Sequence, residues 1–77
     1  MKVYVVTESI REYPYNTSVL RVFNDATTTV SEIKEFIYNY LKEDCFGGNE
    51  PNEIYFYDDG TYDDGIVSVN YTVEEVW

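Results

Sequence analysis

The stretch TVSEIKEFIYNYLK, residues Thr29 to Lys42, decides the fold because its apolar residues recur at helical spacing. Thr29 and Glu32 have the form of a capping box, in which each side chain accepts a hydrogen bond from the other residue's backbone N–H. Lys42 suits the negative end of a helix dipole. We therefore expect an amphipathic helix of about three turns that packs on a sheet through the following residues: Val30, Ile33, Ile37, Tyr40 and Leu41.

Two strands are predicted before this helix. Residues Lys2 to Thr7 are apolar on both faces, which is typical of a central strand. Glu8 to Asn16 contains Pro14 and is expected to be a connection, and the short spacing predicts an antiparallel hairpin with a second strand over Thr17 to Phe23. Strict alternation in this second strand places Leu20 and Val22 on one face and the following residues on the other: Val19, Arg21 and Phe23.

Two further strands are predicted after the helix and a breaker-rich loop. Glu53 to Tyr57 has strand composition, and Ile66 to Val73 alternates, with Val67, Val69, Tyr71 and Val73 on one face. Between them Asp58-Asp59-Gly60 and Asp63-Asp64-Gly65 are turn signals, so the intervening residues are a turn or a very short strand pair. The chain is thus predicted to be one α+β domain, residues 1–77, of order β-β-α-β-β, with an antiparallel-rich sheet and one helix across it.

The chain resembles a ubiquitin-like β-grasp domain in three places. Met1 to Thr7 is similar to that family's first strand, and Thr29 with Ile33 and Ile37 is similar to its helix entry. Ile54 to Phe56, followed by the acidic turn at Asp64-Gly65, is similar to the later strands. The resemblance implies a β-grasp-like fold. The chain ends in Glu-Glu-Val-Trp rather than in the paired glycines that conjugation requires, so we do not expect conjugation.

Charge is concentrated in the second half of the chain. Residues 1–42 contain five acids and five bases, whereas residues 43–77 contain ten acids and no base, which accounts for the whole formal charge of −10. Such a charge opposes direct binding to nucleic acid or to an anionic membrane. The N-terminus lacks a signal-peptide pattern, and a single cysteine excludes an internal disulfide, so we expect a soluble cytoplasmic protein.

Enzymatic and metal-binding functions are not predicted. The chain has no histidine, the commonest general acid–base and metal ligand, and no phosphate-binding glycine loop. Cys45 follows Asp44, whose charge raises a thiol pKa, so we expect an unreactive residue at the edge of the core. The repeated Tyr-Asp-Asp-Gly unit at residues 57–65 does not have EF-hand spacing. We expect no catalytic residue, no metal and no cofactor.

The acids of the second half are interpreted as a surface that imitates nucleic acid. A turn needs only one Asp and one Gly, so the second Asp of each pair is predicted to be surplus. Carboxylates fixed on strands and tight turns match phosphates, because same-face side chains on a strand recur at about 6.6 Å, close to every second phosphate. The predicted partner-binding residues are Glu43, Asp44, Glu50, Glu53, Asp58, Asp59, Tyr62, Asp63, Asp64, Glu74 and Glu75.

The leading hypothesis is a non-catalytic DNA mimic that blocks a host DNA-binding protein. In character the chain resembles the small early proteins with which bacteriophages disable host proteins, which implies a cytoplasmic target in the host. A histone-like nucleoid protein of the HU class is the first expected partner, because such a protein binds DNA without sequence preference. A homodimer of the mimic would extend its charged track.

Two alternatives remain. The chain has nine tyrosines, of which Tyr4, Tyr40 and Tyr71 fit buried or half-buried positions, and the other six cannot all be inside. Because tyrosine is enriched at interfaces, a ubiquitin-like adaptor that binds through tyrosine and aliphatic contacts is possible on the sequence alone. The other alternative is a housekeeping domain whose acidity serves only solubility. The terminal Val76-Trp77 pair is expected to close the core or to meet a second subunit.

Overall fold

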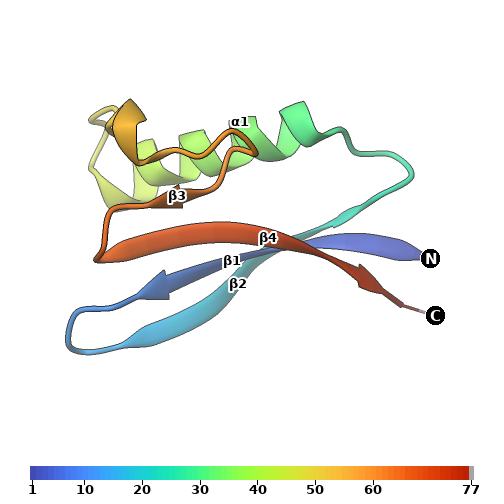
Figure 1. The fold of residues 1–77 in the computed structure, drawn as a ribbon, viewed down its shortest axis with the longest axis horizontal. Helices are drawn as coiled ribbons and strands as arrows, with labels where there is room; N and C mark the ends of the chain where they lie inside the picture. The colour runs from blue at the N-terminus through green and yellow to red at the C-terminus, as the bar shows by residue number, and fades with distance from the viewer. Residues whose placement is uncertain (77) are drawn as a thin grey trace.

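A four-stranded antiparallel sheet with one helix across it forms the fold (Figure 1). The computed structural model describes residues 1–76, so the expectation for Trp77 lies outside the described residues. The elements are β1 (Lys2–Ile10), β2 (Asn16–Asn24), α1 (Val30–Tyr40), β3 (Tyr62–Asp63) and β4 (Val67–Glu75). A π-helical turn η1 (Leu41–Cys45) and a 3₁₀ turn η2 (Glu53–Tyr55) lie between α1 and β3. The predicted α+β class is confirmed.

The strand order is β2-β1-β4-β3, so β1 lies inside the sheet, as its apolar faces predicted. Both β1 and β2 are longer than predicted, and only residues 11–15 connect them instead of Glu8 to Asn16. The polar residues at the end of β1 stay extended because they pair on both sides: Glu8 is opposite Ser18 of β2 and Val69 of β4.

A β-bulge in β2 overturns the predicted alternation of that strand. The pairing changes from Val6 opposite Arg21 to Thr7 opposite Val19, so Leu20 is an extra residue. Leu20 therefore packs against the core on the same side as Phe23, whereas Val19 and Val22 are both exposed, at 60% and 53%.

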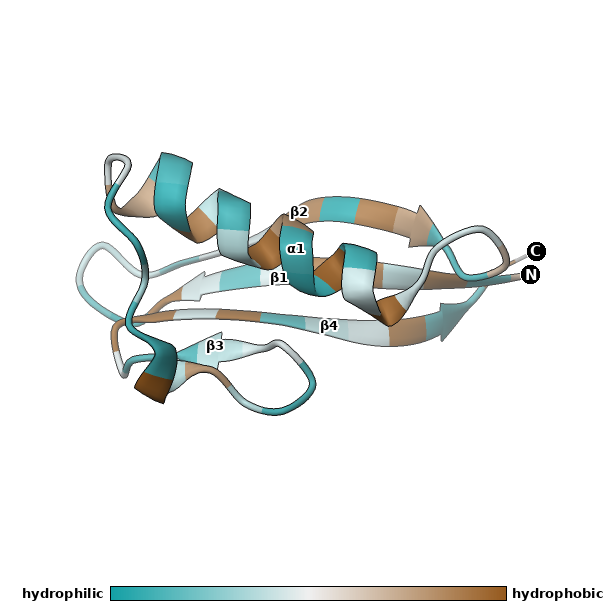
Figure 2. Cartoon of the chain, turned by 90° about the horizontal axis from the view of Figure 1, so that it is seen from above, coloured by the Kyte–Doolittle hydropathy of each residue, from teal (hydrophilic) through white to brown (hydrophobic). Residues whose placement is uncertain are grey.

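The core lies between α1 and the sheet (Figure 2). Ile33, Ile37 and Leu41 are fully buried against Val6 of β1 and Val69 of β4. The predicted apolar stripe is thus confirmed except at Val30, the first residue of the helix, which is 41% exposed. The helical path does not end at Lys42 but continues through η1, where the Phe46 amide donates to the Leu41 carbonyl at 2.9 Å.

The predicted strand over Glu53 to Tyr57 is wrong. The Asn52 carboxamide oxygen accepts the Ile54 amide at 3.1 Å and starts η2, which overrides the strand propensity of these side chains. Only Phe56 pairs with Tyr62, in an isolated bridge, and Tyr62–Asp63 is the strand that joins β4. Both predicted Asp-Gly turns are present, with positive φ at Gly60 (+87°) and Gly65 (+92°).

The capping box predicts a measurable contribution to stability. The Glu32 amide donates to Thr29 Oγ1 at 3.3 Å, and the Thr29 amide donates to Glu32 Oε1 at 3.4 Å. We expect Thr29→Ala to lower the free energy of unfolding by about 1 kcal/mol in urea denaturation. Thr27→Ala is the control, because Thr27 is exposed in the preceding loop, and it should change stability by less than about 0.5 kcal/mol. Equal losses of unfolding free energy in the two variants would contradict a stabilising role of the capping box.

Candidate functional site

The open face of the sheet, opposite α1, carries almost no charge. Residues directly opposite one another in antiparallel strands point to the same face, so the register identifies its members. Its charged residues are Glu74 and Asp63, and Asp63 is paired with Arg11. The open face comprises Val3, Val5, Thr7 and Ser9 of β1, Thr17, Val19, Val22 and Asn24 of β2, Ser68, Asn70, Thr72 and Glu74 of β4, and Asp63 of β3.

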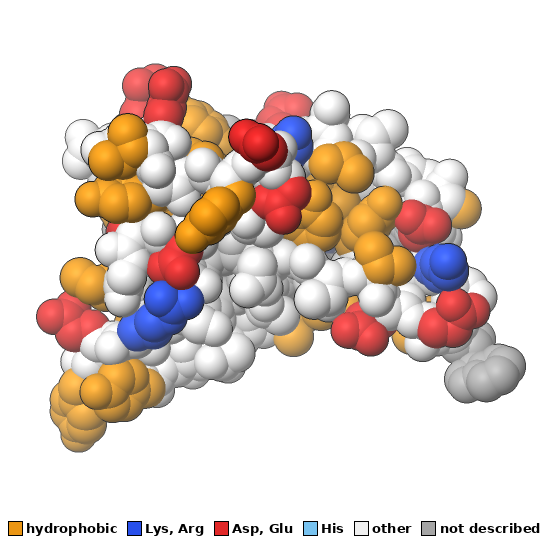
Figure 3. Space-filling model, viewed as in Figure 1, with side chains coloured by type: hydrophobic (Ala, Val, Ile, Leu, Met, Phe, Trp, Pro, Cys, Tyr) orange, Lys and Arg blue, Asp and Glu red, His pale blue; other side chains and the backbone are white. Residues whose placement is uncertain are grey.

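Eight of the ten acids of residues 43–77 lie on the segments that follow α1 and return beside it (Figure 1), and of these eight only Asp63 faces the open side of the sheet. In the view of Figure 3, the acidic side chains are dispersed among apolar and polar side chains and do not form one continuous patch. We call these eight residues the helix-side acids: Glu43 and Asp44 on η1, Glu50 and Glu53 at η2, Asp58 and Asp59 in the loop before β3, and Asp63 and Asp64 at β3 and its turn.

The other two acids lie apart from this group. Glu74 and Glu75 are at the far end of β4, near the N-terminus, and the Glu75 carboxylate is 3.7 Å from the terminal amine of Met1. Because most of the ten acids are on turns, the strand-based match to phosphate spacing has no support in this fold.

Asp59 and Asp63 each hold a turn. Asp59 Oδ1 accepts the Thr61 hydroxyl at 2.7 Å and the Thr61 amide at 3.0 Å, and these bonds lower the pKa of Asp59. Asp63 Oδ1 accepts the Gly65 amide at 2.9 Å, and its two oxygens accept both Arg11 nitrogens at 3.0 Å. The bond from Gly65 and then the one from Arg11 lower the pKa of Asp63.

Asp64 accepts three hydrogen bonds, as Asp63 does. Its Oδ1 accepts the amides of Ile66 and Val67 at 2.9 and 2.8 Å, and its Oδ2 accepts the Tyr62 hydroxyl at 2.8 Å. Burial opposes ionisation of Asp64, but the backbone hydrogen bonds outweigh it and lower the pKa. The expectation of a surplus second Asp is therefore wrong in both pairs, because Asp59 and Asp64 hold turns.

Tyr62 lies in the core rather than among the exposed acids, with 3% of its surface exposed. Tyr4, Tyr40 and Tyr71 are half-buried, as predicted. The most exposed tyrosines are at the β1–β2 connection, where Tyr13 and Tyr15 are 85% and 73% exposed. The remaining predicted partner residues with no side-chain hydrogen bond within residues 1–76 are all exposed: Glu43, Asp44, Glu50, Glu53 and Asp58.

Three of the five bases are engaged within the molecule. Arg11 pairs with Asp63, and the Arg21 guanidinium lies over the rings of Phe23 and Phe36, at 4.8 and 5.7 Å from their centroids. Lys34 packs beside Gly60, where its charge helps to lower the pKa of Asp59. Within residues 1–76, Glu43, Asp44, Glu50, Glu53 and Asp58 form no salt bridge.

Sequence reasoning missed a buried polar cluster between β1 and η1. Glu8 is 8% exposed, and its Oε2 accepts the Tyr40 hydroxyl at 2.6 Å and the Cys45 thiol at 3.3 Å. Burial first, and then the bond to Glu8, raise the pKa of Cys45 to about 11. Burial and Glu8 likewise raise the pKa of Tyr40 far above its usual value. The signal available in the sequence was strand alternation, which places Glu8 on the core face of β1.

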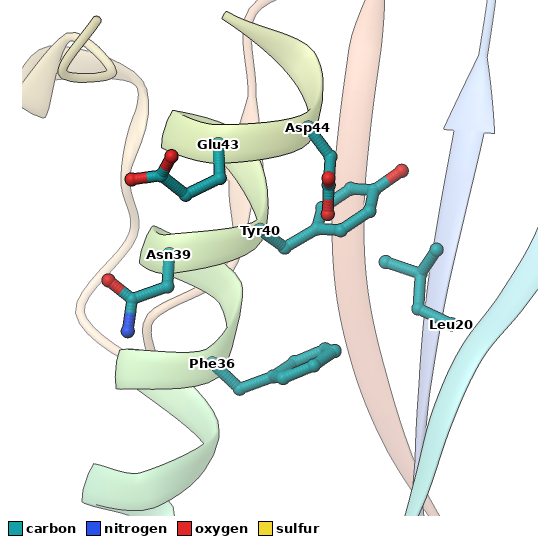
Figure 4. Close-up of a pocket in the computed structure, with 6 residues that line it drawn as sticks. All are labelled: Leu20, Phe36, Asn39, Tyr40, Glu43 and Asp44. Atoms are coloured by element: carbon teal, nitrogen blue, oxygen red, sulfur yellow. The ribbon is translucent and has the colours of Figure 1, made fainter. Parts of the chain in front are cut away.

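A groove of about 480 Å³ lies above this cluster, between α1 with η1 and the bulge of β2 (Figure 4). Its lining residues are Leu20, Phe36, Asn39, Tyr40, Glu43 and Asp44. A second hollow of about 380 Å³ is lined by Tyr38 and Phe56 among others, and a third of about 330 Å³ is lined by Phe46 and Pro51 among others.

Within residues 1–76, no three His, Cys, Asp or Glu side chains are grouped so that they could hold a metal ion. No helix in the same range is long and apolar enough to cross a membrane. Comparison of the chain with protein-family models, curated proteins and solved structures finds no match. Its function is therefore inferred from its own charge and geometry.

The turn bonds of Asp64 predict a stability difference between neighbouring acids. Asp64→Ala leaves two backbone amides without their acceptor, so we expect it to lower the free energy of unfolding by about 2 kcal/mol at pH 7. Asp58→Ala should change stability by less than about 0.5 kcal/mol. Because a lowered pKa stabilises the fold above the ordinary pKa of Asp, the deficit of Asp64→Ala should shrink as the pH falls below about 4. Urea denaturation from pH 7 to pH 3 measures both effects, and a deficit independent of pH would contradict the role of the charge.

The environment of Cys45 predicts that its thiol reacts slowly with alkylating reagents. With a pKa near 11, the thiolate fraction at pH 8 is small, so iodoacetamide should modify the folded protein at least about tenfold more slowly than the urea-unfolded chain. The alkylation rate should keep rising up to about pH 11. Glu8→Gln should lower the pKa only in part, because burial remains. Equal rates for folded and unfolded protein would refute this prediction.

Proposed function

We propose that this protein is a non-catalytic acidic DNA mimic that binds the basic DNA-binding surface of another protein and blocks its access to DNA. One observation carries the proposal: the whole net charge arises in residues 43–77, and eight of the ten acids there lie on the segments that follow α1, seven of them off the open sheet face. The open sheet face has two acids among its thirteen positions, and one of them, Asp63, is paired with Arg11. Acidic charge is thus concentrated on the helix side, where Lys34 of α1 and Lys42 of η1 are the bases.

Anchored backbone supports the proposal further. The helix-side acids are borne by η1, η2 and turns closed by the hydrogen bonds of Asp59, Asp63 and Asp64. Charges on a pre-organised backbone cost less conformational entropy to bind than charges on a mobile chain. Carboxylate pairs with Lys and Arg would then provide affinity, and long-range attraction would accelerate association at low salt.

The partner class follows from the charge. A protein that binds DNA without reading its sequence needs mainly phosphate-like charge from a competitor, so a histone-like HU nucleoid protein is the first target to test. A host target of a bacteriophage protein fits the same chemistry. A homodimer would lengthen the acidic surface, and β2, an edge strand without an acid, gives two copies a place to meet without opposing carboxylates.

One observation favours an adaptor as the second candidate. Val19 and Val22 are exposed side by side with neutral residues on the open sheet face. An adaptor of the ubiquitin-like kind would bind a partner there through apolar contacts, and the acids would contribute little. The variants below separate the two functions.

Charge removal on the helix side should abolish most of the binding to HU. We expect the triple variant Glu50→Gln/Glu53→Gln/Asp58→Asn to weaken binding about tenfold, since each exposed ion pair contributes up to about 1 kcal/mol. These acids hold no turn, so the fold should persist. Isothermal titration calorimetry at low and at physiological salt measures the affinity, and fluorescent duplex DNA should compete with the protein for HU.

Two controls decide between the candidates. Glu12→Gln/Glu74→Gln/Glu75→Gln removes the same charge away from the helix side and should weaken binding only about twofold. Val19→Thr/Val22→Thr keeps the charge and should leave binding unchanged. The mimic proposal fails if the valine variant loses binding while the acidic variant retains it, or if HU binds DNA and this protein together.

A further inference from the structure

We propose that the groove between α1 with η1 and the bulge of β2 binds the guanidinium group of an arginine side chain from the cationic partner. This inference rests on the proposed function for the sign of the partner's charge, and it names the contact that anchors that partner. The site combines aromatic rings, a hollow and carboxylates, which are the three features that a guanidinium uses.

The aromatic surface comes from one side of the helix. Phe36 and Tyr40 project from α1 toward Leu20 of β2 (Figure 4), and their rings lie nearly parallel, 20° apart with centroids at 6.5 Å. Tyr40 cannot rotate freely because its hydroxyl donates to Glu8 at 2.6 Å. Phe36 is held at its edge by Phe23, with ring centroids at 5.5 Å. The groove therefore offers fixed aromatic surface rather than mobile side chains.

Negative charge surrounds the Tyr40 end of the groove. Glu43 and Asp44 are exposed lining residues, and the Glu8 carboxylate lies beneath Tyr40. No Lys or Arg is among the lining residues. At the other end, the Arg21 guanidinium lies 5.7 Å from the centroid of the Phe36 ring. A cation that enters at the Tyr40 end thus meets the two lining carboxylates and an aromatic face.

Arginine suits this groove better than lysine. A guanidinium is planar, so it can stack on a ring while its edge forms paired hydrogen bonds with a carboxylate, whereas an ammonium is a compact, strongly hydrated charge. The protein already uses this chemistry internally, since Arg21 lies over Phe23 and Phe36.

The other two hollows lack this complementarity. Lys34 lines the second hollow beside Glu35 and Glu53 and supplies a cation of its own. The third has Glu50 as its single acid. The first groove is the one that has two acids, two aromatic rings and no base in its lining.

The test is a titration of the ¹⁵N-labelled full chain with tetra-arginine amide at low salt, followed by NMR. We expect the largest amide shifts at lining residues on α1 and η1. Glu43→Gln/Asp44→Asn should weaken the peptide's affinity about tenfold, and Glu50→Gln/Glu53→Gln, with the same change in net charge, less than about threefold. Tetra-lysine amide should bind several-fold more weakly than tetra-arginine. Phe36→Leu should remove that preference, with circular dichroism to verify the fold.

The outcomes separate the groove from the general function. Equal losses of tetra-arginine affinity in the two double variants, or equal affinities for the two peptides, would overturn the groove as an arginine site. If the protein still binds HU, the DNA-mimic proposal stands. Conversely, the peptide's affinity could fall only in Glu43→Gln/Asp44→Asn while the protein does not bind HU. That result would support the arginine site and refute the mimic.

Discussion

The contact of Ile33, Ile37 and Leu41 with Val6 and Val69 is the interaction on which the rest of the structure depends. A small domain buries only a modest part of its surface, so a core of this size leaves little stability to spare. These five fully buried side chains hold α1 across the two central strands, β1 and β4. The position of α1 in turn fixes η1 and the return of the chain through η2, and thereby places the helix-side acids.

Carboxylates have two different roles around this core. Asp59, Asp63 and Asp64 accept backbone amides and keep lowered pKa values, so their charges contribute to folding. Their exposed neighbours make no such bonds within the described chain, and their mutual repulsion opposes folding. The chain thus offsets part of the cost of its charge by closing tight turns with some of the same residue type. This division explains why a variant that neutralises Asp59, Asp63 and Asp64 would test stability rather than binding.

Local signals in the sequence predicted much of the fold, and long-range pairing together with competing local caps accounts for what was missed. The capping box at Thr29 and the alternation of β4 act between near neighbours, so both were visible in the sequence. The bulge at Leu20 depends on pairing with β1, and η2 depends on a cap at Asn52 that competes with strong strand propensity. The acidic half was evident from composition, but the burial of Tyr62 arises only when β3 joins β4. The turn roles of Asp59 and Asp64 are local, through bonds to residues two or three positions on, but a turn signal of the Asp-Asp-Gly kind does not specify which Asp makes them.

The buried Glu8 cluster connects the core to the acidic surface. The Glu8 carboxylate accepts hydrogen bonds from Tyr40 and Cys45. These bonds fix the position of the Tyr40 ring, which lines the groove. A carboxylate in this position is costly to bury unless it is hydrogen-bonded, and the phenol and thiol provide that compensation. The same residue therefore stabilises the join between β1 and the segment formed by α1 and η1, and it fixes an aromatic ring that lines the groove.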